Sequence, residues 1–196
     1  LNGASVTDVT VGAQGGTDRV SAVRGLGGVV GRMTVRGTIE NCVNYAQIEG
    51  TSATSGNVGG IVGAAYYTAE SGEMSITGCS NYGPVSNLCM GVGGIAGLSA
   101  ANVADCANSG AISGNGTSIG GIVGEQQNAG SITGCENTAR ITNGSQTSTG
   151  TGGYGTGGIV GWVRYNGSDT DYPPKEIIAV SGNINPGAIG GRNGGG

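Results

Sequence analysis

A five-residue segment, GGIVG, occurs three times without change in this chain, and two close variants, GGVVG and GGIAG, accompany it. The five copies begin at Gly27, Gly59, Gly93, Gly120 and Gly157, so successive copies start 32, 34, 27 and 37 residues apart. Periods of this size with variable insertions are typical of solenoids, in which each repeat forms one coil. A single unit cannot bury its own apolar face, so we expect the repeats to stack on one another.

A second pattern, I-x-x-C-x-N-x-x-x-I, lies between the copies of the first. Its spacing is unchanged in five copies, the last of which has Asn in place of Cys. The apolar runs are short and rich in Ile and Val, which favours strands, and no ten-residue window has the 3.6-residue period of an amphipathic helix. The copies are Ile39–Cys42–Asn44–Ile48, Ile76–Cys79–Asn81–Val85, Val103–Cys106–Asn108–Ile112, Ile132–Cys135–Asn137–Ile141 and Val180–Asn183–Asn185–Ile189.

The two patterns predict an all-β fold, a single-stranded parallel and right-handed β-helix of about six coils. Neighbouring coils would lie about 4.8 Å apart and place equivalent side chains in columns. Alternation along a strand would send one of the two aliphatic residues of GGIVG inward, while the flanking glycines would permit a tight bend or a close approach between coils. We expect one domain over residues 1–196, with an irregular leading coil at 1–26, repeats at 27–189 and an open or mobile end at 190–196.

Stacking would create one column of Asn and one of Cys. An Asn amide both donates and accepts, and Asn tolerates the left-handed conformation, so the Asn column should hydrogen-bond from coil to coil at a bend. The Cys column would be close enough for disulfides, but we favour buried thiols because Val9 and Asn183 would fill the same place in the end coils. The columns are Asn44, Asn81, Asn108, Asn137 and Asn185, and Cys42, Cys79, Cys106 and Cys135, with Cys89 out of register.

Composition argues against several classes of function. The chain has 45 Gly, no His, only eight Lys plus Arg and a net charge of −4, so we expect it not to bind nucleic acid. It has no apolar run long enough to span a membrane. The glycine-rich segments lack the helix that follows a phosphate-binding loop, and the missing His disfavours a zinc site and a His-activated nucleophile. We therefore expect no cofactor, no metal and no catalytic residue.

Two long connections, residues 64–75 and 162–177, follow GGIVG directly and hold five of the eight aromatic residues. Both should leave the solenoid at the same corner, three coils or about 14 Å apart, whereas a third insertion at 143–156 should leave at another. Aromatic rings beside polar loops suit contact with a sugar or a protein. The alternative is that the rings cover the flank or the open end of the solenoid. The candidate contact surface is Tyr66, Tyr67, Trp162, Arg164, Tyr165 and Tyr172.

A Gly–aliphatic–aliphatic–Gly kernel that follows an I-x-x-C-x-N segment resembles the GLUG motif family, from about Ile39 to Ile189. GLUG repeats occur in bacterial surface and secreted proteins, including adhesin-like proteins of gut Bacteroidetes, and in immunoglobulin A-cleaving metallopeptidases. The resemblance implies a β-solenoid in an extracellular or cell-surface setting. It carries no catalytic residue onto this chain, which has no His to match the zinc-binding HExxH motif of those peptidases.

These observations predict a non-enzymatic extracellular module, adhesin-like or a rigid spacer, that presents loops to a host or matrix glycan or protein. The start at Leu1, without a signal peptide, suggests a mature or excised piece of a longer chain with further domains. The alternative is a polysaccharide-active β-helix enzyme or an accessory module of a larger secreted hydrolase, which clustered carboxylates in a groove would favour. The acids are scattered, and Asp169 and Asp171 form the only close pair outside the kernels. A purely structural stalk is the third possibility.

Overall fold

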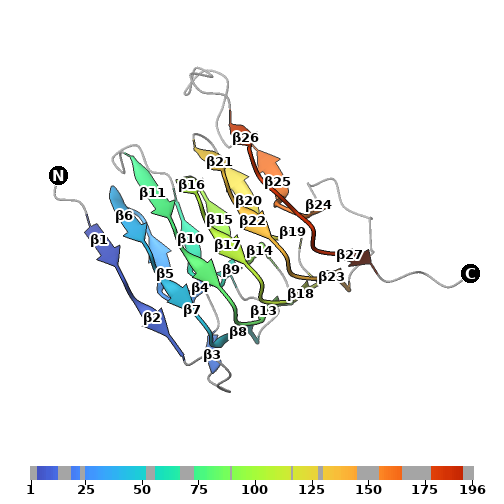
Figure 1. Cartoon of the computed structure of the whole chain (residues 1–196). Coiled ribbons are helices and arrows are strands. Elements are labelled where there is room, and N and C mark those ends of the chain that lie inside the picture. The colour runs from blue at the N-terminus through green and yellow to red at the C-terminus, as the bar shows by residue number, and fades with distance from the viewer. Residues whose placement is uncertain are drawn as a thin grey trace, which may run out of the picture.

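The computed structural model of the chain is a parallel β-solenoid (Figure 1). It describes residues 4–12, 19–22, 25–51, 56–66, 73–88, 90–115, 117–127, 130–144, 155–164 and 178–191. Within these ranges all paired strands are parallel, and no helix has the length and apolar character needed to span a membrane. The predicted fold class is thus confirmed: an all-β chain whose coils stack on one another.

Each full coil contributes one strand to each of five sheets, named A to E in the order in which the chain enters them. Sheet A contains β1 (Ala4–Thr7), β6 (Gly37–Glu40), β11 (Met74–Thr77), β16 (Asn102–Ala104), β21 (Ser131–Thr133) and β26 (Ala179–Ser181). Sheet B contains β2 (Thr10–Val11), β7 (Val43–Asn44), β12 (Ser80–Asn81), β17 (Ala107–Asn108) and β22 (Glu136–Asn137). Sheet C contains β3 (Arg19–Ala22), β8 (Gln47–Gly50), β13 (Val85–Asn87), β18 (Ile112–Gly114), β23 (Ile141–Asn143) and β27 (Ile189–Gly191).

The GGIVG kernels lie where the chain passes from sheet D to sheet E. Sheet D contains β4 (Leu26–Gly27), β9 (Val58–Gly59), β14 (Val92–Gly93), β19 (Ser118–Gly120) and β24 (Gly155–Gly157). Sheet E contains β5 (Val30–Met33), β10 (Val62–Ala65), β15 (Ala96–Ser99), β20 (Val123–Gln127) and β25 (Val160–Arg164). Coils one to five are β1–β5, β6–β10, β11–β15, β16–β20 and β21–β25, and β26 and β27 begin the sixth.

Equivalent residues of successive coils pair directly, so each sequence pattern becomes a column. Ile39 pairs with Val6 on one side and with Ile76 on the other, and the column continues through Val103 and Ile132. In the leading coil, β1 to β5 all pair with the strands of coil two. A repeat whose kernel has diverged therefore still forms the same coil.

The interior contains two apolar clusters. One joins sheets A and E and includes Ile39, Cys42 and Val62, and the other joins sheets C and D and includes Ile48 and Val58. Each cluster repeats along the solenoid axis, because each coil adds the same side chains to it. Burying an Ile or Val side chain contributes about 1.5–3 kcal/mol, so this stacking is the main source of stability.

The predicted Asn column is a continuous ladder of side-chain amides. Each Nδ2 donates to the Oδ1 of the Asn in the next coil, at 2.8 Å from Asn44 to Asn81 and at 2.7 Å from Asn137 to Asn185. Each Nδ2 also donates to the carbonyl two residues ahead, as Asn81 does to Gly83 at 2.9 Å. Asn44 to Asn137 are fully buried, so these bonds satisfy amides that would otherwise be costly inside the solenoid.

The left-handed conformation belongs to another column, three residues before the Asn. Asn41 and Asp105 have φ values of 53° and 52°, and Gly78 and Gly134 have 63° and 62° at the same position. None of the ladder Asn has positive φ. The turn from sheet A to sheet B therefore uses this conformation just before the Cys, while the ladder Asn belong to the strands of sheet B or lie in register with them.

The second glycine of GGIVG faces the Asn ladder across the interior. A Cβ added to Gly60 would lie 2.3 Å from Cγ of Asn81, and one added to Gly121 would lie 2.5 Å from Cγ of Asn137. Asn44 stands in sequence between Cys42 of one cluster and Ala46 of the other. The Asn–Gly contacts therefore separate the two apolar clusters, and this position requires glycine because an amide already fills the space.

Both aliphatic residues of GGIVG are buried, contrary to the expected alternation. Ile61 and Val62 are each 0% exposed and belong to the same cluster. The reason is that Ile61 lies in the bend between β9 and β10 rather than in a strand, so two successive side chains point into one core. The pairs Ile95–Ala96 and Ile122–Val123 repeat this arrangement.

The Cys column consists of buried free thiols, as favoured from the sequence. Cys79 Sγ lies 3.4 Å from the carbonyl oxygen of Thr77 and 3.7 Å from that of Ile39, in the coil before. Burial raises the pKa of the Cys42 thiol, and hydrogen bonding with its neighbours Cys135 and Cys79, together with burial, raises that of Cys106. Asn183 ends the column by accepting a hydrogen bond from the Cys135 N–H at 2.8 Å.

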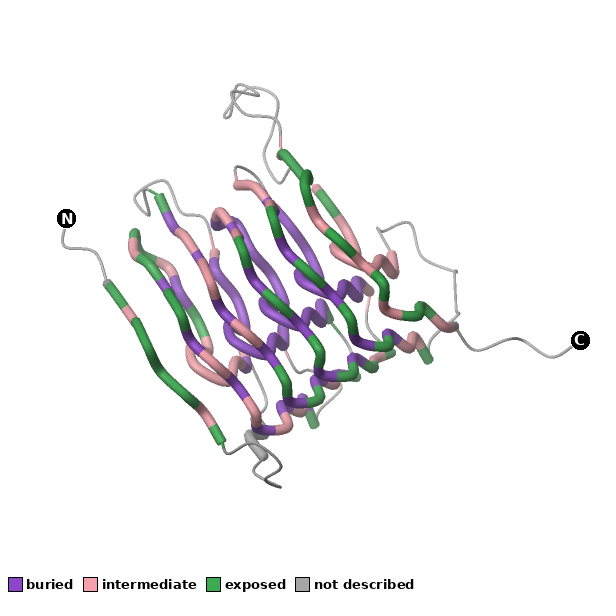
Figure 2. The backbone as a smooth tube through the Cα atoms, in the orientation of Figure 1, coloured by how far each residue is buried: buried purple, intermediate pink, exposed green. Residues whose placement is uncertain are grey.

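The last described coil leaves its core face uncovered (Figure 2). Val180 and Ile189 continue the two main apolar columns but are 42% and 51% exposed, whereas Ile132 and Ile141 beneath them are 0% and 0% exposed.

Candidate contact surface

The two aromatic-rich connections leave the solenoid at the same corner, as predicted. β10 ends at Ala65 and β25 ends at Arg164, and both are strands of sheet E whose next described strand belongs to sheet A. We call this corner the E–A corner. Residues 143–156 instead connect β23 of sheet C to β24 of sheet D. Other predicted positions, namely Tyr67, Cys89, Tyr165, Asp169, Asp171 and Tyr172, lie outside the described residues.

Tyr66 is half-buried and held by both neighbouring elements. Its N–H donates to the carbonyl of Met33 in the coil before, at 2.9 Å. The guanidinium of Arg32 lies over its ring, with Cζ 4.8 Å from the ring centroid. Asn57, which precedes β9, donates to its hydroxyl at 3.4 Å. The ring is therefore fixed in place at the start of the first connection.

Trp162 and Arg164 form the corresponding group in coil five. They are two residues apart on β25, and Cζ of Arg164 lies 4.7 Å from the Trp162 ring centroid. Arg164 also forms an ion pair with Glu125 of β20, and Gln127 donates to the same carboxylate oxygen. Glu125 is 5% exposed, so Arg164 compensates a carboxylate that would be costly to bury alone.

Tyr66 and Trp162 do not form one continuous surface. The register runs from Ala64 through Leu98 and Glu125 to Trp162, so three coil steps, about 14 Å, separate the two groups. Each group is a ring paired with an Arg, and a cation–π pair of this kind contributes about 0.5–1 kcal/mol at an exposed site. A partner that contacts both groups must extend along the solenoid axis. A contact role for the six predicted residues stays a prediction.

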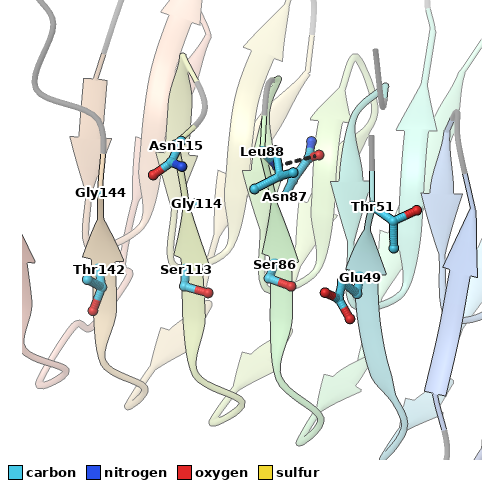
Figure 3. A pocket seen from close by; sticks show the side chains of 11 residues that line it. Glu49, Thr51, Ser86, Asn87, Leu88, Ser113, Gly114, Asn115, Thr142 and Gly144 are labelled. Atoms are coloured by element: carbon cyan, nitrogen blue, oxygen red, sulfur yellow. Dashed lines mark hydrogen bonds between the residues drawn. The ribbon is translucent and has the colours of Figure 1, made fainter. Parts of the chain in front are cut away.

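A shallow polar groove runs along the outer face of sheet C (Figure 3). Its volume is about 330 Å³, and its floor is a row of polar side chains from neighbouring strands, Glu49, Ser86, Ser113 and Thr142. Sequence reasoning missed this groove, although each of these residues directly follows the last aliphatic residue of the second pattern. Among the described residues that line it, Glu49 is the only carboxylate.

A stacked tyrosine pair was also missed. Tyr45 and Tyr82 follow the ladder Asn in two successive coils, and their ring centroids lie 4.9 Å apart with an interplanar angle of 11°. The sequence signal is the tetrapeptide Cys-x-Asn-Tyr, which occurs at 42–45 and 79–82. Because the ladder is in register, two such tetrapeptides in adjacent coils place their rings one above the other.

The other acidic residues near the patterns do not gather into a site. Glu40, Asp105 and Glu136 are exposed and occupy three different columns, at the end of β6, in the left-handed turn and at the start of β22. Among the described residues, no group of three or more His, Cys, Asp or Glu is placed to hold a metal ion. These acids therefore lie on an outer face in contact with solvent.

Residues 115–142 match the family model of the GLUG motif. This segment runs from the end of sheet C through β19, β20, β21 and β22 to β23, and the residue before it, Gly114, pairs with Asn143, the residue after it. The matched motif is thus one complete coil that contains a GGIVG kernel and a copy of the second pattern. No curated protein and no solved structure matches the chain.

Proposed function

We propose that this chain is a non-enzymatic extracellular repeat module, a rigid support that presents the connections of the E–A corner for contact with a host or matrix glycan or protein. The observation that supports this most directly is the repetition at that corner of an aromatic ring paired with an Arg, Arg32 with Tyr66 and Arg164 with Trp162. Tyr, Trp and Arg are the residues that dominate binding energy at protein interfaces.

The stacked coils favour a role as a support. Backbone pairing joins successive coils on five sheets, and a buried amide ladder adds one side-chain bond at each step from coil two to coil six. Loops that begin on such a scaffold have fixed starting points, as functional loops on rigid scaffolds commonly do. A GLUG coil at 115–142 agrees with the resemblance from which the extracellular setting was expected.

The contact role is tested with the double variant Tyr66→Ala, Trp162→Ala. Wild type and variant are compared on a glycan array and on a panel of immobilised extracellular-matrix proteins. We expect every ligand that wild type binds through this corner to bind the variant at least about tenfold more weakly. The reason is that large aromatic rings contribute much of the binding energy at an interface, and the variant lacks both rings. Thr77→Ala, on sheet A, is the matched control.

Circular dichroism on heating would establish that all variants remain folded. Unchanged binding of the double variant to each ligand found would contradict a contact role at the E–A corner. If wild type binds neither glycans nor matrix proteins, the module is a structural stalk. The extracellular setting is tested separately, by accessibility of the protein to added protease on intact cells that produce it.

A further inference from the structure

The outer face around the turn from sheet B to sheet C carries side chains of very different size in successive coils. In this region every second residue is exposed and the residues between are buried, most regularly from Ala107 to Ser113 (Figure 2). The outward positions therefore form three columns that can be compared coil by coil. The middle column contains Tyr45, Tyr82, Ser109 and Thr138.

Tyr82 is the last ring of its stack. One of its faces meets Tyr45 of coil two, at 4.9 Å between centroids. The next residue of the column, Ser109 of coil four, is too short to reach the other face. Tyr82 is 50% exposed, whereas Tyr45 is half-buried. An aromatic face is thus turned along the solenoid axis, above a position with no ring.

Coil four provides a strip of short side chains beside that face. The strip consists of Ala107, Ser109 and Ala111, all of them exposed. In coil three the same positions hold Ser80, Tyr82 and Pro84, and Ser80 pairs directly with Ala107. The strip is one coil wide, about 4.8 Å, and offers one hydroxyl and no charge.

Coil five closes the far side of the strip with longer polar side chains. Glu136 pairs with Ala107, and Arg140 accepts at its carbonyl the hydrogen bond from Ile112, which places it beside Ala111. Both side chains are exposed and carry opposite charges. The strip therefore lies between an aromatic ring on one side and the coil-five residues Glu136 and Arg140 on the other. The Arg140 guanidinium extends toward coil six, where its Nη2 lies 3.8 Å from a Cβ added to Gly190.

From this arrangement we infer that one unit of a neutral saccharide binds above Ser109, stacked on the free face of Tyr82. The apolar C–H face of a pyranose packs on an aromatic ring at nearly the distance that separates the two Tyr rings, so the sugar takes the place of a third ring in the stack. Its outward hydroxyls then donate to the Glu136 carboxylate and, once the exposed Arg140 side chain turns from coil six toward the strip, accept from its guanidinium. Charges of opposite sign on one side favour a ligand without net charge.

This site is separate from the E–A corner, and its existence does not depend on the function proposed for that corner. The probes are neutral tetrasaccharides of glucose, xylose, mannose and galactose, titrated to about 10 mM by calorimetry, with saturation-transfer NMR for weak binding. We expect at least one of them to bind wild type. Tyr82→Ala should weaken that binding about tenfold, because it removes the stacking surface.

Ser109→Tyr is the sharper variant, because a third Tyr would occupy the proposed position of the sugar while extending the existing stack. We expect it to abolish detectable binding with the melting temperature unchanged or raised. Ser113→Tyr is the matched control, since it adds a Tyr in the same coil on an exposed position of sheet C, and it should bind like wild type.

Three outcomes would overturn the inference. The first is that no tetrasaccharide binds wild type, and the second is that tetrasaccharide binding survives Ser109→Tyr. The third is that a Trp-containing peptide binds at Tyr82 and no sugar does. Tyr66→Ala, Trp162→Ala separates this test from that of the E–A corner, because it should leave tetrasaccharide binding at Tyr82 unchanged whether or not the corner binds a partner.

Discussion

Sheets D and E differ from sheets B and C in how deeply their residues are buried. In coils two to four the strands of D and E are buried along their whole length, whereas those of B and C alternate between buried residues and outer ones (Figure 2). A Cβ on Gly97 of sheet E would lie 2.4 Å from the backbone nitrogen of Val58 in sheet D. Backbone thus packs on backbone in one half of the coil, while the other half exposes side chains.

This difference explains why the GGIVG pattern is nearly invariant, whereas the outward residues of the other sheets vary from coil to coil. GGIVG recurs almost letter for letter because no atom can be added at its glycines without meeting backbone or the Asn ladder. The residues of the outer column, Tyr45, Tyr82, Ser109 and Thr138, share only their outward position. Residues that make this module different from others with the same fold are therefore expected on sheets A to C and in the connections.

The largest effect expected from this comparison is that of Gly121→Ala. The new Cβ would lie 1.9 Å from the carbonyl oxygen of Gly158 and 2.5 Å from Cγ of Asn137, so backbone or ladder must move. We expect the free energy of unfolding to fall by more than about 4 kcal/mol in urea denaturation.

Gly190→Ala in β27 is the control for that variant, because its Cβ would meet no atom closer than 3.8 Å. It should change stability by no more than about 0.5 kcal/mol. Equal stability of the two variants would show that close backbone packing does not dictate the glycine pattern.

A smaller effect is expected from breaking the amide ladder in the middle. Asn108→Ala leaves Nδ2 of Asn81 without its acceptor and Oδ1 of Asn137 without its donor, both in the buried interior. The expected loss is about 2–3 kcal/mol by chemical denaturation. Asn185→Ala, at the half-buried end of the ladder, should cost clearly less, and a greater loss there than at Asn108 would contradict the role of burial.

The smallest effect concerns pH. The pKa of the Cys106 thiol is raised in the folded state by hydrogen bonding within the Cys column and by burial, so its contribution is complete below about pH 8.5 and is lost as the pH rises above that value. Wild type should therefore lose more stability than Cys106→Ala between pH 8 and pH 10, measured by urea denaturation at each pH. Parallel stability curves for the two proteins over this range would disprove it.

The sequence was enough to predict the coils, because the constant spacing of Ile, Cys and Asn identifies the residues that are equivalent in successive coils. It also located the E–A corner, since both long connections follow GGIVG. It could not show that Ile61 and Val62 share a cluster, because Ile61 lies in the bend between β9 and β10, whereas alternation assumes that both residues belong to one strand. The sequence did not predict the stack of Tyr45 and Tyr82 or the groove of sheet C. Contact between outward residues depends on which coils are adjacent.

The amide ladder has a direction. From Asn44 to Asn185, each Nδ2 except the last donates to the coil that follows, and each Oδ1 except the first accepts from the coil that precedes. The four junctions between coils two and six are therefore chemically the same. Excising or duplicating one whole turn would rejoin matching donors and acceptors, whereas an insertion of any other length inside the patterns would misalign them. A solenoid of this kind can therefore become longer or shorter in evolution by whole coils, without any change to its interior residues.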